Sequence, residues 1–242
     1  MKYFKITVRK LFSLLFNRIT YHFFWKKINV SRAGKTLLPG ITAVVSAKNE
    51  EYLIPMCLRS LVGFADQVVC IDNGSDDRTH EEMLRFKEEF GDKMEIDILS
   101  MPRALLGECR EAGLKATRFQ WHLRWDADMI AKTSGADDFK IMRKMAIDNP
   151  YPIAYQLART NIYGDLRHTT KMYEIHDPGE PILVRFCSRI RYVEYGKFDT
   201  IKLPLFYKTV LIEKKFYFHC NCVKPDSRLF YRNIYFDWRE LC

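Results

Sequence analysis

The chain has 242 residues, 48% of them hydrophobic and 29% charged, which is enough for one large domain or two small ones. Its seven cysteines are odd in number and scattered, which argues against a disulfide framework and indicates a reducing compartment. The net charge is +9, but nine of the 39 Lys and Arg residues lie in residues 1–40, where there is no acid, and the rest of the chain is neutral.

The basic N-terminal segment, residues 1–40, is also apolar. Its longest uncharged runs, 11–17 and 19–25, are too short to cross a bilayer, which needs about 20 apolar residues. At helical spacing an apolar stripe forms beside the basic residues; it contains Phe4, Val8, Leu11, Leu15, Ile19 and Phe23. We expect a helix lying on an anionic membrane surface, so that the protein is cytoplasmic and peripherally membrane-associated. A helix packed against the domain is the alternative. Nucleic acid is not an expected partner, because no recognition motif accompanies the charge.

From residue 41 onward, short apolar runs alternate with helical patterns. The predicted strands are 41–47, 66–72, 94–100 and 121–125, and the predicted helices between them cover 53–61, 79–90 and 107–118. Thr79 with Glu82 predicts a capping box at the start of the second helix. This alternation predicts an α/β fold with a mostly parallel central sheet.

Polar residues follow each predicted strand, and in such sheets ligands bind beyond the carboxyl ends of the strands. Two aspartates, Asp126 and Asp128, follow the fourth strand, and residues i and i+2 of an extended chain point the same way. Two carboxylates this close repel each other unless a cation or a proton holds them. Oxygen ligands of this kind favour Mg²⁺ or Mn²⁺.

Three segments, "ITAVVSAKNEEYLIPMCLRSL", "QVVCIDNGSDDRT" and "RWDADM", occur in this order and together resemble the family-2 glycosyltransferases. The resemblance implies the GT-A fold, a three-layer α/β/α sandwich that binds a nucleotide sugar. It covers residues 41–130 most strongly, so these are expected to form the nucleotide-sugar-binding half and residues 131–242 the acceptor half.

The resemblance also implies roles for particular residues. Ser46, Lys48 and Glu50 would lie against the nucleotide. Asp72 and Asn73 would meet the base, and Arg110 would reach the diphosphate. Asp126 would contact the ribose and the metal shell, and Asp128 would be a ligand of Mn²⁺ or Mg²⁺.

Three of these residues have a simpler alternative role. Asp72 can open an Asx-turn, Lys48 can be an ordinary exposed lysine, and Arg110 can be a solvated helix residue. The family often has a second acid where this chain has Asn73, which leaves the donor base and sugar open.

The second half is less informative. The pattern predicts a helix over 137–148, strands within 150–163 and 180–196, and a terminal amphipathic helix over 226–241. Asp199 matches the place where many family members carry a general base, although Glu174, Asp177 and Glu194 compete with it. A base there would imply inversion at the sugar carbon. His219 resembles the late histidine that completes the metal shell in some relatives; a half-buried structural histidine is the alternative.

The sequence therefore predicts a metal-dependent glycosyltransferase that moves a sugar from a nucleotide donor to a cell-surface glycan, lipopolysaccharide or glycolipid. A nucleotidyltransferase would need a glycine-rich loop after the first strand, and "SAKNEEYL" has no glycine. A non-catalytic relative that binds a membrane or a partner is the other alternative. No oligomeric state is predicted.

Overall fold

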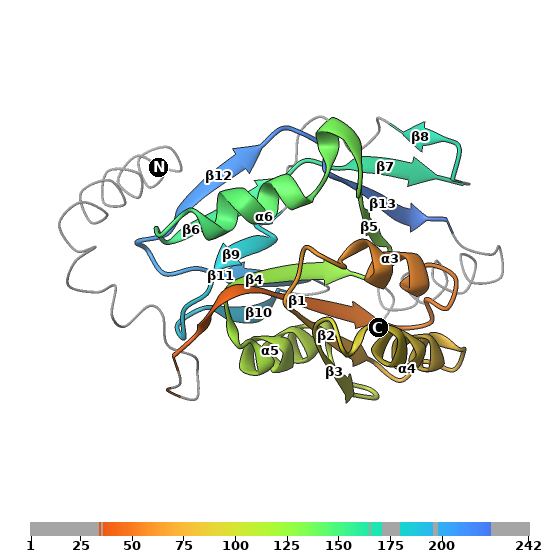
Figure 1. Ribbon diagram of the computed structural model, residues 1–242. Helices are drawn as coiled ribbons and strands as arrows, with labels where there is room; N and C mark the ends of the chain where they lie inside the picture. Colours follow the sequence, from red (N-terminus) through yellow and green to blue (C-terminus); the bar gives the residue numbers. More distant parts are fainter. Residues whose placement is uncertain (1–33, 35, 165, 171–179, 196–197, 224–242) are drawn as a thin grey trace.

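The computed structural model describes residues 34, 36–164, 166–170, 180–195 and 198–223 (Figure 1). The predicted membrane-associating helix and the predicted terminal helix lie outside the described residues. Within the described part of the chain, no helix is long and apolar enough to cross a membrane.

A seven-stranded sheet forms the centre of the fold. Its strands, in spatial order, are β12 (Lys208–Ile212), β6 (Ile153–Leu157), β9 (Leu183–Arg185), β4 (Phe119–Asp126), β1 (Leu38–Ala47), β2 (Gln67–Asp72) and β3 (Glu95–Ser100). Strand β9 is antiparallel to both of its neighbours, and the other four pairs are parallel. The prediction of a mostly parallel sheet is therefore confirmed.

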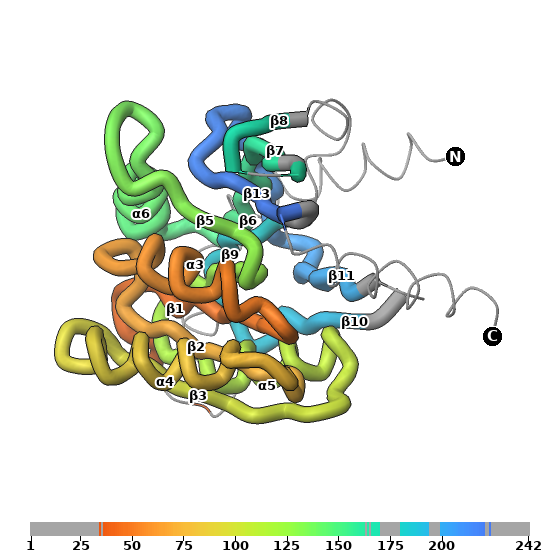
Figure 2. The backbone as a smooth tube through the Cα atoms, turned by 90° about the vertical axis from the view of Figure 1, so that its right-hand side faces the viewer, coloured from red at the N-terminus to blue at the C-terminus, as the bar shows by residue number. Residues whose placement is uncertain are grey.

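Helices cover both faces of this sheet (Figure 2). They are α3 (Ile54–Ser60), α4 (Thr79–Phe90), α5 (Leu106–Ala116) and α6 (Lys140–Ile147). Successive residues of β1 point to opposite faces. Val45 belongs to the core cluster that includes residues of α3, α4 and α6, and Val44 belongs to the cluster that includes Cys109 of α5. The alternation of apolar residues along one strand thus produces three layers.

Helix α4 covers the predicted residues, but its predicted capping box is wrong. Thr79 is the first residue of the helix, and no side chain caps the helix from the preceding position. Instead Asp77 Oδ1 accepts hydrogen bonds from the Thr79 backbone N–H at 2.9 Å and from its hydroxyl at 2.5 Å. The Thr79 hydroxyl thus donates its hydrogen to Asp77, and its oxygen accepts a hydrogen bond from the Glu50 backbone N–H at 2.7 Å.

Two smaller sheets lie beside the central one. The four-stranded sheet has the order β5 (Met129–Ala131), β13 (Tyr217–Cys222), β7 (Thr160–Tyr163) and β8 (Thr169–Thr170), and β10 (Arg191–Tyr195) pairs with β11 (Phe198–Lys202). Strand β5 follows β4 almost directly, so the small sheet begins at the end of the central strand. This places residues late in the chain next to the predicted aspartate pair.

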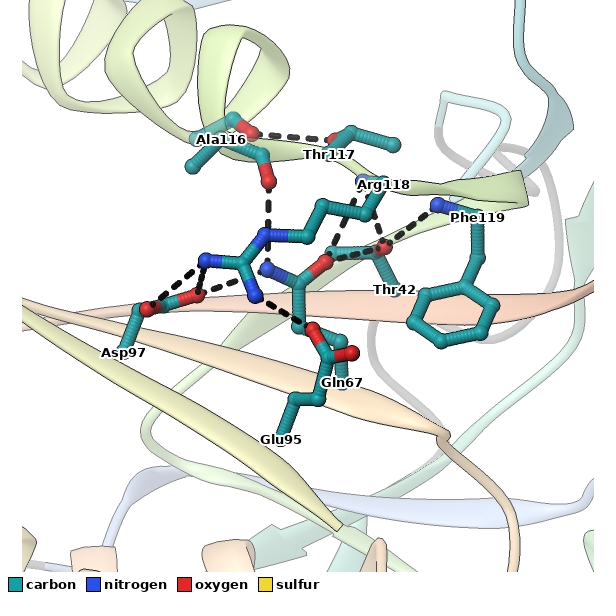
Figure 3. Close-up of polar contacts among 9 residues, drawn as sticks. Thr42, Gln67, Glu95, Asp97, Ala116, Thr117, Arg118 and Phe119 are labelled. Atoms are coloured by element: carbon teal, nitrogen blue, oxygen red, sulfur yellow. Dashed lines mark hydrogen bonds and ion pairs between the residues drawn. The ribbon is translucent and has the colours of Figure 1, made fainter. Parts of the chain in front are cut away.

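A buried polar network fixes the end of α5 against the sheet (Figure 3). The Gln67 side-chain amide donates to Asp97 Oδ2 at 2.7 Å and to the Ala116 carbonyl at 3.1 Å. Its oxygen accepts from the Thr42 hydroxyl at 2.7 Å and from the Arg118 backbone N–H at 3.2 Å. Every polar atom of this fully buried amide has a partner, which is what a stable interior requires. The network connects the last residue of α5 to the strands.

Candidate active site

The carboxyl ends of β1, β2 and β4 meet at one edge of the sheet. In the strand register Ser46 is the partner of Asp126, and Ala47 is the partner of Asp72. The polar residues that follow three separate strands therefore lie next to one another, where open α/β sheets bind ligands.

The loop after β1 is joined to the loop after β2. Asn49 has a positive φ of 58°, and its side-chain oxygen accepts a hydrogen bond from the Asp76 backbone N–H at 2.9 Å. The Asn49 backbone N–H donates to the Ser75 hydroxyl at 3.0 Å. Next to Asn49, Lys48 is exposed and Glu50 is half-buried. These bonds hold the two loops together as one rim.

Asp72, the last residue of β2, and Asn73, which follows it, form different contacts. Asp72 is buried, and its Oδ1 accepts from the backbone N–H of Ser75, three residues on, at 3.0 Å. The bond holds the turn after β2 but spans one residue more than the Asx-turn given as the alternative. Asn73 donates its side-chain amide to the Ala104 carbonyl at 3.0 Å. Within the described part of the chain, no atom forms a hydrogen bond with the buried oxygens Asn73 Oδ1 and Ser46 Oγ. A bound ligand would satisfy such atoms.

Arg110 is buried and joins two acids. Its Nη2 donates to Asp126 Oδ1 at 2.6 Å, and its Nε lies 2.6 Å from Asp199 Oδ2. The second contact is an ion pair without the alignment of a hydrogen bond, since both of its atoms lack a hydrogen-bond partner in the described structure. The predicted diphosphate-binding arginine and the predicted general base thus contact each other.

The charges around Asp126 alternate in sign. Arg124 Nη2 lies 3.9 Å from Asp126 Oδ2, and Arg124 Nη1 donates to Glu180 Oε2 at 2.7 Å. Burial favours the protonated form of Asp126, but the guanidinium groups of Arg110 and Arg124 outweigh it and hold the pKa of this carboxyl well below its usual range. For Arg110, burial acts to lower the pKa, but the negative charges of Asp126 and Asp199 outweigh it, and the pKa of Arg110 is raised. Asp126 is therefore an anion fixed between two cations.

Asp128 contacts His219. Asp128 Oδ1 lies 3.4 Å from His219 Nε2, and both side chains are largely buried. Strands β13 and β5 bring the two residues close, because His219 is the partner of Met129 and the Cys220 backbone N–H donates to the Asp128 carbonyl at 2.8 Å, while Asp128 itself lies in the turn before β5.

A carboxylate with an imidazole is a donor set that suits Mn²⁺ and accommodates Mg²⁺. Among the described residues, no group of three or more His, Cys, Asp or Glu side chains is arranged to hold a metal ion. Asp126 Oδ1 is bound to Arg110, so the metal role predicted for Asp126 falls to its Oδ2, which lies 3.9 Å from Arg124 Nη2. The pair of Asp128 and His219 fits a metal that takes its remaining ligands from diphosphate and water.

Sequence reasoning missed several polar residues around this site. Arg124 precedes Asp126 by two residues in the same strand, so the alternation of side chains could have placed it. Arg159 and Asn161 have the same spacing at the start of β7 and form a hydrogen bond of 3.1 Å. For Glu180, no local pattern indicates its contact with Arg124.

Comparison with known proteins identifies the family. The model of glycosyl transferase family 2 matches residues 42–209. A search of curated proteins returned no match. Among solved structures, S. aureus TarS is 17% identical over 79% of this chain and 38% of that chain, with a TM-score of 0.51.

The TarS fragment 1–349 in complex with UDP-GlcNAc is 16% identical over 76% of this chain and 59% of that chain, with a TM-score of 0.53. The chain thus spans between 38% and 60% of the TarS chains it matches, and the likeness concerns the fold. With the mostly parallel sheet and its carboxylate-lined edge, the match over most of the chain shows that it belongs to glycosyl transferase family 2 and has the GT-A fold.

Proposed function

We propose that this protein is a metal-dependent glycosyltransferase that transfers a sugar from a nucleotide sugar to a hydroxyl of a cell-surface glycan, lipopolysaccharide or glycolipid. The observation that carries the proposal is the position of the Asp128–His219 pair at the carboxyl edge of the sheet, beside the fixed anion of Asp126. Family membership supports the reaction class.

The donor nucleotide would lie across the joined loops after β1 and β2. Ser46 and Asn73 each present a buried oxygen without a partner in the described structure, and a base or ribose has N–H and O–H groups that could donate to them. Lys48 and Glu50 would line the same rim. The related TarS fragment has been crystallised with UDP and with UDP-GlcNAc, which makes a uridine nucleotide the first probe to use.

Asp128 and His219 would hold Mn²⁺ or Mg²⁺, which would neutralise the charge of the diphosphate leaving group. Arg110 and Arg124 keep Asp126 ionised at the edge of the same site. Asp126 would then act on the ribose as a hydrogen-bond acceptor, with its orientation set by the two guanidinium groups.

Asp199 would take the proton of the acceptor hydroxyl and so give inversion at the sugar carbon. Its carboxylate forms an ion pair with Arg110, and 6% of the Asp199 side chain is exposed. The base role therefore requires the acceptor to reach the face of the carboxylate that Arg110 leaves uncovered.

The basic segment 1–40 would keep the enzyme at the cytoplasmic face of an anionic membrane, near a lipid-linked acceptor. A non-catalytic relative that binds a membrane or partner is the rival. It would retain the fold but have no metal-dependent affinity for a nucleotide.

Calorimetry separates the two. We expect one of UDP, GDP, CDP and dTDP to bind the purified protein with Mn²⁺ and to lose its affinity with a chelator or in Asp128→Ala. Asp92→Ala, an exposed aspartate in the turn before β3, is the matched control and should bind as the wild type does. Failure of all four nucleotides to bind the folded protein would overturn the proposal.

A further inference from the structure

Asn161 lies beside the Asp128–His219 pair. It is on β7, 7% exposed, and its register partner on the parallel strand β13 is His219. Partners in register on neighbouring strands project from the same face of the sheet. The same histidine lies 3.4 Å from Asp128 on its other side, so the Asn161 amide belongs to the surroundings of the proposed metal ligands.

The orientation of this amide is fixed by Arg159. Arg159 Nε donates to Asn161 Oδ1 at 3.1 Å. A guanidinium group has donors and no acceptor, so the amide oxygen must face it and the NH₂ group must point away. The reversed amide would place two donors against each other.

The NH₂ group is buried and lacks an acceptor. Within the described residues, no atom accepts a hydrogen bond from Asn161 Nδ2. A buried donor that is held in one orientation and left unpaired lowers stability, and such groups in native proteins have a reason, such as a bound water or ligand.

We propose that Asn161 is a donor-binding residue, whose NH₂ group donates a hydrogen bond to an oxygen of the nucleotide sugar held at the Asp128–His219 pair. The inference rests on the proposed function, because it needs a nucleotide sugar at this edge. Two kinds of oxygen share the required chemistry: an oxygen of the diphosphate and a hydroxyl of the transferred sugar. Arg159 is then a positioning residue, because it acts by orienting the amide.

Two variants test the proposal. Asn161→Asp keeps the oxygen that Arg159 binds and replaces the donor by an acceptor, while Asn161→Ala removes the donor without adding a charge. Asn149→Asp is the matched control, because Asn149 Nδ2 has its own partner, the Tyr155 hydroxyl at 3.0 Å, outside the site. Thermal unfolding of all three variants establishes that they are folded.

The measurement is calorimetric binding, with Mn²⁺, of the nucleoside diphosphate that the wild type binds among UDP, GDP, CDP and dTDP, and of the corresponding nucleotide sugar. We expect both Asn161 variants to lose at least tenfold in affinity for the nucleotide sugar, and Asn149→Asp to lose less than twofold. An equal loss for the nucleoside diphosphate assigns the contact to the diphosphate. A loss confined to the nucleotide sugar assigns it to a sugar hydroxyl.

Unchanged affinity of both Asn161 variants for both ligands would overturn the inference and leave the NH₂ group to a buried water. A wild type that binds none of the nucleotides would instead overturn the proposed function, and this inference with it. Affinity for Mn²⁺ alone, measured in Asn161→Ala, should equal that of the wild type. A lower value would show that the variant damages the metal pair and would overturn the assignment of a direct contact.

Discussion

Asp126 Oδ1 lies 2.6 Å from Nη2 of Arg110, whose side chain is 2% exposed, and Nε of the same guanidinium group lies 2.6 Å from Asp199 Oδ2. One cation therefore serves two carboxylates from different parts of the chain. The end of the central strand and the β10–β11 hairpin are tied together through it.

Arg110→Ala should be strongly destabilising. Removing one partner of a buried ion pair leaves charge without compensation and typically costs about 3–5 kcal/mol. Urea unfolding measures the loss. Arg59→Ala is the control, because its pair with Glu89 is half-exposed, and such pairs are worth about 0–1 kcal/mol. Equal losses in the two variants would contradict a special role for Arg110.

The free energy of unfolding should depend on pH through Asp126. Its pKa is lower in the folded protein than the value of about 3.9 for an unfolded aspartate. The stabilisation is therefore fully present above the unfolded pKa and is lost as the pH falls toward the folded pKa. Urea unfolding between pH 7 and pH 2 should show a shallower acid loss in Asp126→Asn than in the wild type. An equal loss of stability with falling pH in the two proteins would refute the contribution of Asp126.

Gly113→Ala should also destabilise the protein. A Cβ at Gly113 would lie 2.3 Å from Val44 Cγ1, so α5 approaches β1 closely at this glycine. Overpacking of this kind costs about 1–3 kcal/mol. Lys115→Ala, at an exposed position of the same helix, should change the free energy of unfolding by less than about 0.5 kcal/mol. A neutral Gly113→Ala would mean that the helix can move away from the strand.

The sequence predicted the elements that have strong local patterns. The apolar runs at 41–47 and 66–72 correspond to β1 and β2, and the helix predicted over 79–90 is α4. The convergence of the strand ends followed from parallel pairing, and the register places Ser46 next to Asp126. These features need only the period of hydrophobicity and a rule of sheet topology.

The ion pairs of Arg110 could not be predicted in this way. Its partners Asp126 and Asp199 lie on β4 and on β11, and their meeting depends on where the hairpin packs. The capping box failed for a similar reason, since Asp77 offers Thr79 an acceptor that the motif does not consider. Where a side chain has several possible partners, the tertiary structure decides which of them it contacts.

His219→Ala should weaken metal-dependent binding without unfolding the protein. The imidazole lies 3.4 Å from Asp128 and is partly accessible, with 17% of the side chain exposed. We expect the affinity for Mn²⁺ to fall at least tenfold by calorimetry. His168→Ala, in an exposed stretch before β8, is the control. Wild-type affinity in His219→Ala would show that the histidine is structural.

Asp199→Asn tests whether the acid that Arg110 holds also takes a proton in catalysis. The variant keeps the shape of the side chain but removes its basicity, and loss of a general base typically lowers kcat by about 10²–10⁴-fold. If Asp199 is the base, donor binding with Mn²⁺ should be retained while transfer to the acceptor falls. If Asp199 is only the counterion of Arg110, the free energy of unfolding should fall, whereas kcat should stay within a few-fold of the wild type. Measuring the free energy of unfolding, donor affinity and kcat on the same preparation distinguishes the two roles, because the ion pair with Arg110 contributes to folding whether or not an acceptor is bound.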